Sequence, residues 1–299
     1  MKDWLSAFRL RSLPLALTCI LMGSFLAQAK GLFRIEITLL GVLTAALLQI
    51  LSNLANDYGD AKSGVDSAQR VGPSRAVQTG KISASAMKNA IFLFSGLSFL
   101  SGIMLLLVAF WGSEKLLQNF IIFLGIGVLA ILAAIFYTNG KKPYGYVGLG
   151  DIAVLIFFGW VGVMGIFFLH TGTFEALFLL PATSCGLFAV AVLNVNNIRD
   201  IPSDALAGKN SIPVRLGRKN AVFYHWSLLA GGLICTCAYV YVSFHSFWQL
   251  LFLISVPLML INAIAVKNKT LASDLDPYLK QMAISALVFT LTFGLGMIL

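Results

Sequence analysis

The sequence is poor in charged residues, and this shortage argues against an ordinary soluble domain. Only 11% of its 299 residues are charged, while 59% are hydrophobic; soluble domains have about 25% charged residues. A soluble chain of this length needs far more polar surface to cover its core. The composition therefore predicts an integral membrane protein.

Histidine and cysteine are also scarce, and their positions exclude further classes of function. The three histidines are far apart in the sequence, so neither a histidine-ligated metal site nor a Ser-His-Asp catalytic group is expected. The four cysteines all fall within apolar stretches, and no histidines accompany them at metal-ligand spacing. They indicate small packing residues and no disulfide framework.

Apolar stretches of about twenty residues recur along the whole chain, and each is long enough to cross about 30 Å of hydrocarbon. We predict nine membrane-spanning helices, over residues 13–29, 36–55, 89–110, 119–138, 150–170, 176–196, 221–244, 247–266 and 281–299. The break between the fifth and the sixth is the least distinct, since only His170 to Glu175 separates them. The predicted fold class is an all-α membrane protein, folded as a single transmembrane domain over residues 1–299.

Lysine and arginine are divided unevenly between the two predicted sides of the membrane. With nine spans, the N-terminus shares one side with the second, fourth, sixth and eighth loops, and this side holds all but three of the 21 basic residues. The three on the opposite side are Lys30, Arg34 and Lys115. The positive-inside rule then predicts a cytoplasmic N-terminus and an outward C-terminus. The net charge of +9 is explained by this asymmetry and an anionic substrate, and a nucleic acid partner is not expected.

Two polar clusters follow the second and the sixth predicted helices, and they share one arrangement. Each begins with asparagines on the last turn of an apolar helix, continues into spaced aspartates and is followed by basic residues. The first contains Asn53, Asn56, Asp57, Asp60 and Asp66, and the second contains Asn194, Asn196, Asn197, Arg199, Asp200 and Asp204. The recurrence indicates a shared site.

The spacing of the aspartates favours a bound cation. Asp57 and Asp60 are three positions apart, and Asp200 and Asp204 are four apart, so a continuing helix places each pair on one face. Carboxylates gathered in this way repel one another unless cations lie between them, and Mg²⁺ is bound in proteins through carboxylates and substrate phosphates. Two clusters suggest two or more ions that clamp a diphosphate, with arginine and lysine on its remaining oxygens. The alternative is a pair of ordinary polar helix ends; the matched arrangement favours a site.

The fourth loop adds a third polar element. Three tyrosines and two lysines fall within residues 137–146. The face of an aromatic ring can stabilise a carbocation as it does an ammonium group. Tyrosines and lysines are also routine anchors at the edge of a membrane, so both interpretations of this loop stay open.

Four strings carry a resemblance to a known family. They are Asn53-Leu-Ala-Asn56-Asp57-Tyr58-Gly-Asp60, Gly72-Pro-Ser-Arg75-Ala-Val-Gln-Thr-Gly80, Tyr144-Gly-Tyr-Val-Gly-Leu-Gly-Asp151, and the run from Asn196 through Asp200, Asp204 and Lys209 to Gly217. With about nine helices, the chain resembles the UbiA family of intramembrane prenyltransferases over essentially its full length. Within it, the chain is most similar to the branch that prenylates 1,4-dihydroxy-2-naphthoate in menaquinone synthesis.

The resemblance implies roles for particular residues. Mg²⁺ and the diphosphate would be held by Asp57, Asp60, Asp66, Asp200 and Asp204, with Asn53 and Asn56. Arg75 and Lys209 would pair with the diphosphate, and Tyr137 would face the allylic cation. Further candidate substrate-binding residues are Asn197, Arg199 and Lys142.

Two departures from the family pattern bear on these roles. Asp66 lies six positions after Asp60, where the general family has four, and Ala76 follows Arg75 where the wider family often has proline. The first puts the role of Asp66 in doubt, and the second favours the naphthoate branch.

The implied reaction has polyprenyl diphosphate and dihydroxynaphthoate as substrates, Mg²⁺ as cofactor and the lipid bilayer as surroundings. Mg²⁺ neutralises the leaving diphosphate, the allylic C–O bond ionises, the electron-rich ring attacks, and the ring carboxylate leaves as CO₂. Water must be excluded because it would quench the cation. The carboxylate of the acceptor could be bound by Arg9, Arg11 or Lys142, and the sequence does not choose among them.

Two alternatives remain. The acceptor could be another aromatic acid such as 4-hydroxybenzoate, or the protein could be a transporter linked to divalent cations. A transporter should carry ionisable residues near the middle of its spans, whereas these spans are almost free of them. The sequence therefore favours an enzyme of the cell membrane with its active-site loops on the cytoplasmic side.

Overall fold

The computed structural model describes residues 2–63 and 76–299, and within them it consists of helices and connecting segments without strands. In chain order the elements are α1 (Lys2–Phe8), η1 (Leu10–Ser12), α2 (Leu13–Ala29), α3 (Ile35–Ser63), α4 (Ala84–Phe110), α5 (Leu116–Phe136), η2 (Tyr144–Val147), α6 (Gly150–Val154), η3 (Leu155–Met164), α7 (Gly165–Thr171), η4 (Ala176–Phe178), α8 (Leu179–Arg199), α9 (Ile201–Leu206), α10 (Ile212–Ser243), η5 (Phe247–Ser255), α11 (Val256–Asn268) and α12 (Ala272–Ile298). In this part of the chain, nine segments are long and apolar enough to cross a membrane. The predicted fold class and the predicted number of spans are confirmed.

Several boundaries differ from the prediction. The first predicted helix coincides with α2, whereas the second continues eight residues beyond position 55 to Ser63. Asp57 and Asp60 therefore lie inside a helix and not in a loop. The seventh begins at Ile212 and not at 221, and a non-helical residue, Gly217, bends α10 near its start. Hydropathy locates apolar stretches, but polar helical turns that extend beyond them leave no hydropathy signal.

The break between the fifth and the sixth spans is confirmed. The fifth span consists of α6, the π-helical segment η3 and α7, which ends at Thr171. Gly172 follows with a φ of 69°, a conformation that glycine adopts at little cost at the end of a helix. The short turn η4 then leads into α8, which carries the second predicted cluster.

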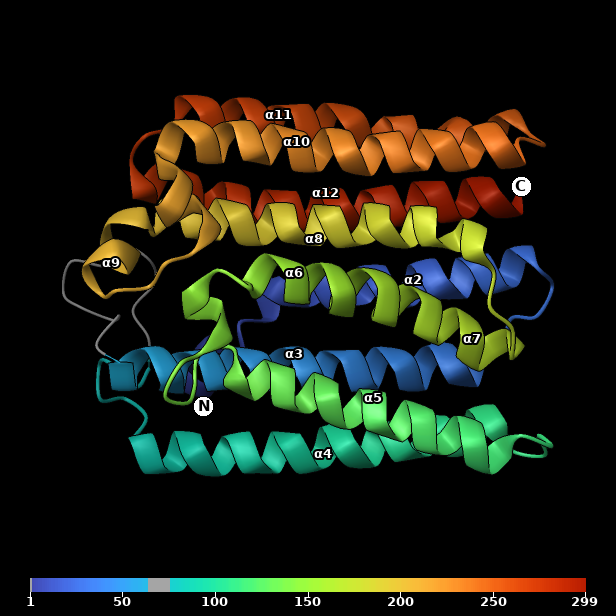
Figure 1. Ribbon diagram of the computed structural model, residues 1–299, viewed down its shortest axis with the longest axis horizontal. Helices are drawn as coiled ribbons and strands as arrows, with labels where there is room; N and C mark the ends of the chain where they lie inside the picture. Colours follow the sequence, from blue (N-terminus) through green and yellow to red (C-terminus); the bar gives the residue numbers. More distant parts are fainter. Residues whose placement is uncertain (1, 64–75) are drawn as a thin grey trace.

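The helices run nearly parallel to one another across the molecule (Figure 1). α10, α11 and α12 lie with α8 on one side of the bundle, α3, α4 and α5 lie on the other, and α2 and the fifth span run between them. α8 packs closely on η3 because glycines meet there: a Cβ atom on Gly159 would lie 2.8 Å from the carbonyl oxygen of Ala182. Small residues permit such close approach of membrane helices.

The polar segments gather at one end of the bundle. Figure 1 places the N-terminus, α9 and the start of α6 toward the left end, while the C-terminus lies at the right end. α3 and α8 both direct their polar last turns to the left end. The fold therefore brings together two clusters that are about 140 positions apart in the sequence.

Candidate active site

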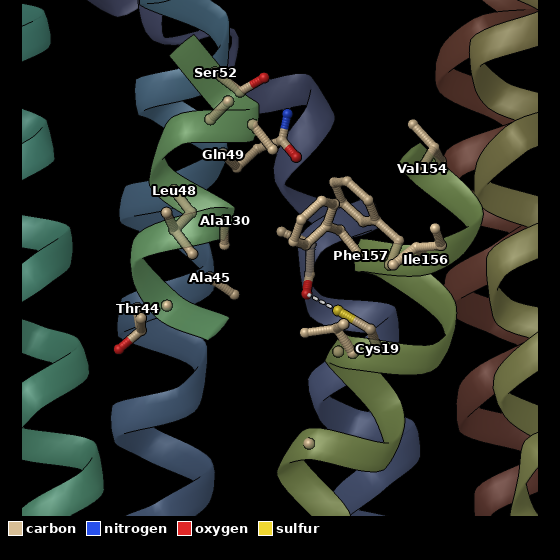
Figure 2. Close-up of a pocket in the computed structure, with 18 of the residues that line it drawn as sticks. Cys19, Thr44, Ala45, Leu48, Gln49, Ser52, Ala130, Val154, Ile156 and Phe157 are labelled. Atoms are coloured by element: carbon tan, nitrogen blue, oxygen red, sulfur yellow. Dashed lines mark hydrogen bonds between the residues drawn. The ribbon is translucent and has the colours of Figure 1, made fainter. Parts of the chain in front are cut away.

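A cavity of about 690 Å³ runs inside the bundle between α2, α3, α5, the fifth span and α8. Most of its lining is apolar; in Figure 2, Leu48 and Ala130 lie on one side and Ile156 and Phe157 on the other. Its polar lining residues include Arg9, Arg11, Asn53, Asn56, Tyr137, Asn196 and Lys209. The cavity is of the size that holds small molecules in proteins, about 300–1,000 Å³.

The first cluster lies on the last turns of α3. Asp57 and Asp60 are buried, with 2% and 1% of their surface exposed. The Asp57 carboxylate forms an ion pair with Arg9, and the Asp60 carboxylate accepts a hydrogen bond of 2.5 Å from the Tyr146 hydroxyl. Both acids thus contact residues from other parts of the chain, which fixes the end of α3.

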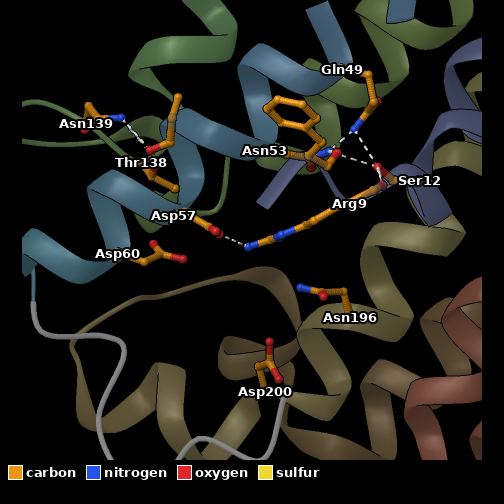
Figure 3. A network of polar contacts seen from close by, with 12 residues as sticks. Arg9, Ser12, Gln49, Asn53, Asp57, Asp60, Thr138, Asn139, Asn196 and Asp200 are labelled. Carbon is orange, nitrogen blue, oxygen red and sulfur yellow. Dashed lines mark hydrogen bonds and ion pairs between the residues drawn. The ribbon is translucent and has the colours of Figure 1, made fainter. Parts of the chain in front are cut away.

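Arg9 reaches Asp57 from an unusual backbone conformation. It has φ 48° and ψ 54°, and among the described residues it is the single non-glycine residue with positive φ. This left-handed region costs an L-residue about 1–2 kcal/mol. The Asn53 side chain fastens the same segment, because its amide donates to the Phe8 carbonyl at 2.9 Å and to the Ser12 hydroxyl at 3.0 Å (Figure 3).

Gly59 explains how the fourth loop approaches α3 between the two acids. A Cβ atom at this position would lie 2.6 Å from the backbone oxygen of Thr138. Thr138 and Asn139 both donate hydrogen bonds to the Ala55 carbonyl, at 3.0 and 2.9 Å. The loop is therefore fixed against the helix that carries Asp57 and Asp60.

The second cluster lies where α8 meets α9. The Asp200 carboxylate accepts two hydrogen bonds from Arg199, at 2.7 and 2.8 Å, and Asp204 forms an ion pair of 3.0 Å with Lys209. Burial raises the pKa of the Asp204 carboxyl; Lys209 opposes this change, and the charges of Asp200 and Asp60 add to it. The pKa thus responds to acids from both clusters.

The two clusters face one another. Tyr146 connects them, because its hydroxyl donates to Asp60 while its ring lies 5.9 Å from the Nζ atom of Lys209, which pairs with Asp204. In Figure 3, Arg9 extends toward Asp57 on one side, with Asp200 across from them. The structure therefore brings Asp57, Asp60, Asp200 and Asp204 to the same region of the molecule, whereas Asp66 lies outside the described residues.

Tyr137 follows the last residue of α5 and lines the cavity. Its ring meets that of Tyr144 edge to face, with centroids 5.4 Å apart, and Gly145 and Gly150 leave room for it. Burial, and then the charges of Asp151 and Asp60, raise the pKa of the Tyr137 phenol well above its usual value. The phenol is therefore uncharged at physiological pH, and the role of its ring beside an allylic cation stays a prediction.

The other predicted residues lie in several different places. Asn56 and Lys209 line the cavity together with Asn53. Asn197 is buried and does not line it, whereas its neighbour Asn196 does, since successive helical residues point to different faces. Arg199 is buried and holds Asp200 without lining the cavity.

Three predicted residues are not found at the cavity in the described part of the chain. Lys142 is exposed on the fourth loop and does not line it. Asp66 and Arg75 lie outside the described residues. Their predicted roles in binding substrate or metal stay predictions.

Four residues of this region were not predicted as site residues. Tyr146 and Asp151 belong to one of the family-like strings, but neither was singled out as a site residue. Asp151 is buried and accepts a hydrogen bond of 2.9 Å from the Tyr224 hydroxyl. Asp276, near the start of α12, contacts both Arg199 and Arg11; the fourth, Asn196, was quoted in the motif without being chosen.

The donor set of this site is suited to a hard cation. Within residues 2–63 and 76–299, no three acidic, histidine or cysteine side chains are grouped so closely that they alone form a metal site. The buried aspartates of the two clusters nevertheless supply oxygen atoms of the type that Mg²⁺ prefers. In the described part of the site, Arg9, Arg199 and Lys209 pair with Asp57, Asp200 and Asp204.

The fold and the site together define a class: a multi-pass helical membrane protein with a carboxylate-rich site at the polar end of an intramembrane cavity. The UbiA prenyltransferase family model matches residues 16–287, and the chain belongs to this family. The resemblance in the sequence is confirmed, and the protein is a prenyltransferase.

Similar proteins span almost the entire chain. It is 47% identical to 1,4-dihydroxy-2-naphthoate octaprenyltransferase of Escherichia coli (strain K12), over 99% of this chain and 95% of that protein. It is 44% identical to the protein of the same name from Haemophilus influenzae, over 100% and 96%. A UbiA homolog from Archaeoglobus fulgidus, solved bound to DMAPP and Mg²⁺, has the same fold, with a TM-score of 0.61 at 18% identity over 97% of this chain and 99% of that one.

Proposed function

We propose that this protein transfers a polyprenyl group from polyprenyl diphosphate to 1,4-dihydroxy-2-naphthoate, with loss of the ring carboxylate as CO₂, in menaquinone synthesis. The main observation is that buried aspartates of both clusters, Asp57 and Asp204, pair with Arg9 and Lys209, which line the polar end of an apolar cavity. The names of the relatives from E. coli and H. influenzae support the acceptor and a long prenyl donor.

In this proposal, different parts of the donor bind to different parts of the cavity. The diphosphate binds at the polar end, where Arg9 and Lys209 line the cavity beside Asp57 and Asp204. The prenyl chain extends along the apolar lining, which gains from burying hydrocarbon. Tyr137 lies at the boundary between the two parts and presents its ring to the allylic carbon. The apolar walls keep water from this carbon while the C–O bond breaks.

Mg²⁺ is the proposed cofactor. Asp57, Asp60, Asp200 and Asp204 would hold it, with Asp66 as a further candidate ligand outside the described residues. When bound, it supplies positive charge that stabilises the leaving diphosphate. The aspartates provide its oxygen ligands, and the presence of Mg²⁺ together with DMAPP in the A. fulgidus homolog supports this assignment.

The site faces the cytoplasm in this proposal, and the protein lies in the cell membrane. Figure 1 places the N-terminus and α9 at the polar end, and the sequence assigns 18 of the 21 basic residues to the side of the membrane that the N-terminus shares with the even-numbered loops. A site that faces the cytoplasm can also be reached by a water-soluble aromatic acid, and the diphosphate that is released can leave into water.

The proposal is tested with purified protein, a polyprenyl diphosphate, Mg²⁺ and a panel of aromatic acids. We expect a decarboxylated, prenylated product from dihydroxynaphthoate, identified by mass spectrometry. Product from 4-hydroxybenzoate and none from dihydroxynaphthoate would overturn the acceptor assignment alone. The absence of prenylated product from every acceptor would contradict the proposed reaction.

A further inference from the structure

Asp276, near the start of α12, lies between two arginines. Its Oδ1 atom is 2.6 Å from Nη1 of Arg199, and its Oδ2 atom is 3.2 Å from Nη1 of Arg11. Arg199 in turn holds both oxygens of Asp200. A chain of charges therefore connects the N-terminal segment, through α12, to the second aspartate cluster.

The basic residues of the cavity differ in their partners. In the part of the chain that the structure describes, the basic residues that line it are Arg9, Arg11 and Lys209. Arg9 pairs with Asp57 of the first cluster, and Lys209 pairs with Asp204 of the second. Arg11 pairs with Asp276, which belongs to neither cluster. Among the described residues, Arg11 is thus the cavity-lining cation that the proposed diphosphate site does not use.

The Arg11 guanidinium keeps most of its hydrogen-bonding capacity. Among residues 2–63 and 76–299 it donates one hydrogen bond, from Nη1 to Asp276, although a guanidinium has five N–H donors. About 35% of its side chain is exposed. The paired N–H groups of arginine match the two oxygens of a carboxylate. A singly charged organic anion in an apolar cavity needs such a partner, because burying it unpaired is costly.

We infer that Arg11 binds the carboxylate of the aromatic acceptor and that Asp276 is the positioning residue that holds Arg11 at the cavity. This inference rests on the proposed function, which requires an aromatic carboxylate as substrate. Of the three basic residues that the sequence left open for this role, Arg9 is committed to Asp57 and Lys142 lies outside the cavity. Because Asp276 also contacts Arg199, it connects the acceptor site with the residue that holds Asp200.

The test is direct binding of two fluorescent probes to the purified full-length protein without a prenyl donor. The probes are 1-hydroxy-2-naphthoate, which carries the carboxylate, and 1-naphthol, which lacks it. We expect Arg11→Ala to raise the Kd of the naphthoate about tenfold or more and to leave that of naphthol unchanged. Arg11→Lys retains the charge and restores part of the affinity, and Lys141→Ala, on the exposed fourth loop, changes neither Kd.

Steady-state kinetics provide the second readout. Arg11→Ala should raise the KM for dihydroxynaphthoate and leave the KM for the prenyl diphosphate unchanged, since the lost contact involves one substrate only. The inference would be overturned if Arg11→Ala left the Kd of the naphthoate unchanged, or weakened the binding of both probes equally. A rise in KM confined to the prenyl diphosphate would overturn it as well. Binding that depends on Arg11 in a protein that fails to prenylate dihydroxynaphthoate would instead overturn only the proposed function.

A double-mutant cycle tests the role of Asp276. Asp276→Asn should weaken naphthoate binding in the wild-type background and add nothing to Arg11→Ala, because it acts through Arg11. If the Kd of the double variant instead rises by the product of the two single-variant fold-changes, Asp276 does not act through Arg11. Unfolding temperatures of all variants are compared, so that a loss of fold is not taken for a loss of binding.

Discussion

At the scale of single residues, the described part of the site consists of buried acids that are each held by a contacting side chain. Asp57 pairs with Arg9, Asp204 pairs with Lys209, and Asp60 accepts from Tyr146. Each partner holds its carboxylate in place within the site. In the proposed reaction the acids are already in place before a divalent cation and a diphosphate bind, which is the usual advantage of a preorganised electrostatic site.

Loss of one carboxylate from either cluster should stop turnover. We expect Asp57→Asn and Asp200→Asn each to lower the rate by about 100-fold or more, since each removes a charged ligand and keeps the shape of the side chain. The rate is measured by chromatography of the prenylated product. Asp274→Asn, which changes an acid outside both clusters, is the matched control and should retain activity. Wild-type rates in either cluster variant would show that the acids are not part of the catalytic site.

Removal of the metal should have the same effect as removal of its ligands. With excess EDTA we expect product formation to cease, because the leaving diphosphate then lacks its counter-charge. Added Mg²⁺ should restore the rate, and the amount needed should rise in a variant such as Asp60→Asn that loses an oxygen ligand. Undiminished activity in EDTA would rule out a metal-dependent reaction.

At the scale of elements, α3 and the fourth loop depend on each other. Gly59 lies against the backbone of Thr138, and the loop in turn carries Tyr146, which contacts Asp60. The loop therefore positions the site and also packs against the helix. This packing also explains why α3 continues as a helix through residues that hydropathy assigns to a loop.

A methyl group at position 59 should disturb this contact. We expect Gly59→Ala to destabilise the protein by about 1–3 kcal/mol, because its Cβ atom would overlap a backbone oxygen that cannot move freely. The unfolding temperature in detergent and the prenylation rate should both fall. Gly96→Ala in α4 is the control, since its Cβ meets open space and alanine favours a helix over glycine. Equal stability of the two variants would contradict the role given to Gly59.

Some features of these elements could be predicted from the sequence, and others could not. The first predicted helix has the bounds of α2, and the aspartate spacing identified both clusters, because both signals are local. The contacts of Arg9 with Asp57 and of Arg199 with Asp276 join residues 48 and 77 positions apart. No local pattern encodes such contacts, since they depend on how the helices pack. Asp276 was therefore not recognised as part of the site.

At the scale of the whole molecule, the bundle separates polar from apolar surroundings along its length. The aspartate clusters, the fourth loop and the N-terminal segment gather at one end, and an apolar cavity extends from there between the helices. A charged head group and a hydrocarbon tail thus find different surroundings within one site. Burial of the tail inside the membrane region also removes the need to extract it into water.

The orientation of this arrangement in the membrane leads to a last prediction. Lys115 precedes α5 and Lys141 follows it, and the 21 residues of α5 span about 30 Å, so the two lysines lie on opposite sides of the bilayer. The excess of basic residues at the site end predicts that Lys141 faces the cytoplasm. We replace each by cysteine in a background where Cys235 and Cys237 are alanine, and we treat intact cells with a membrane-impermeant maleimide. Lys115→Cys should react at once, and Lys141→Cys only after the membrane is permeabilised, because the reagent cannot cross it. The reverse pattern would place the site on the outer face and would contradict the proposed orientation.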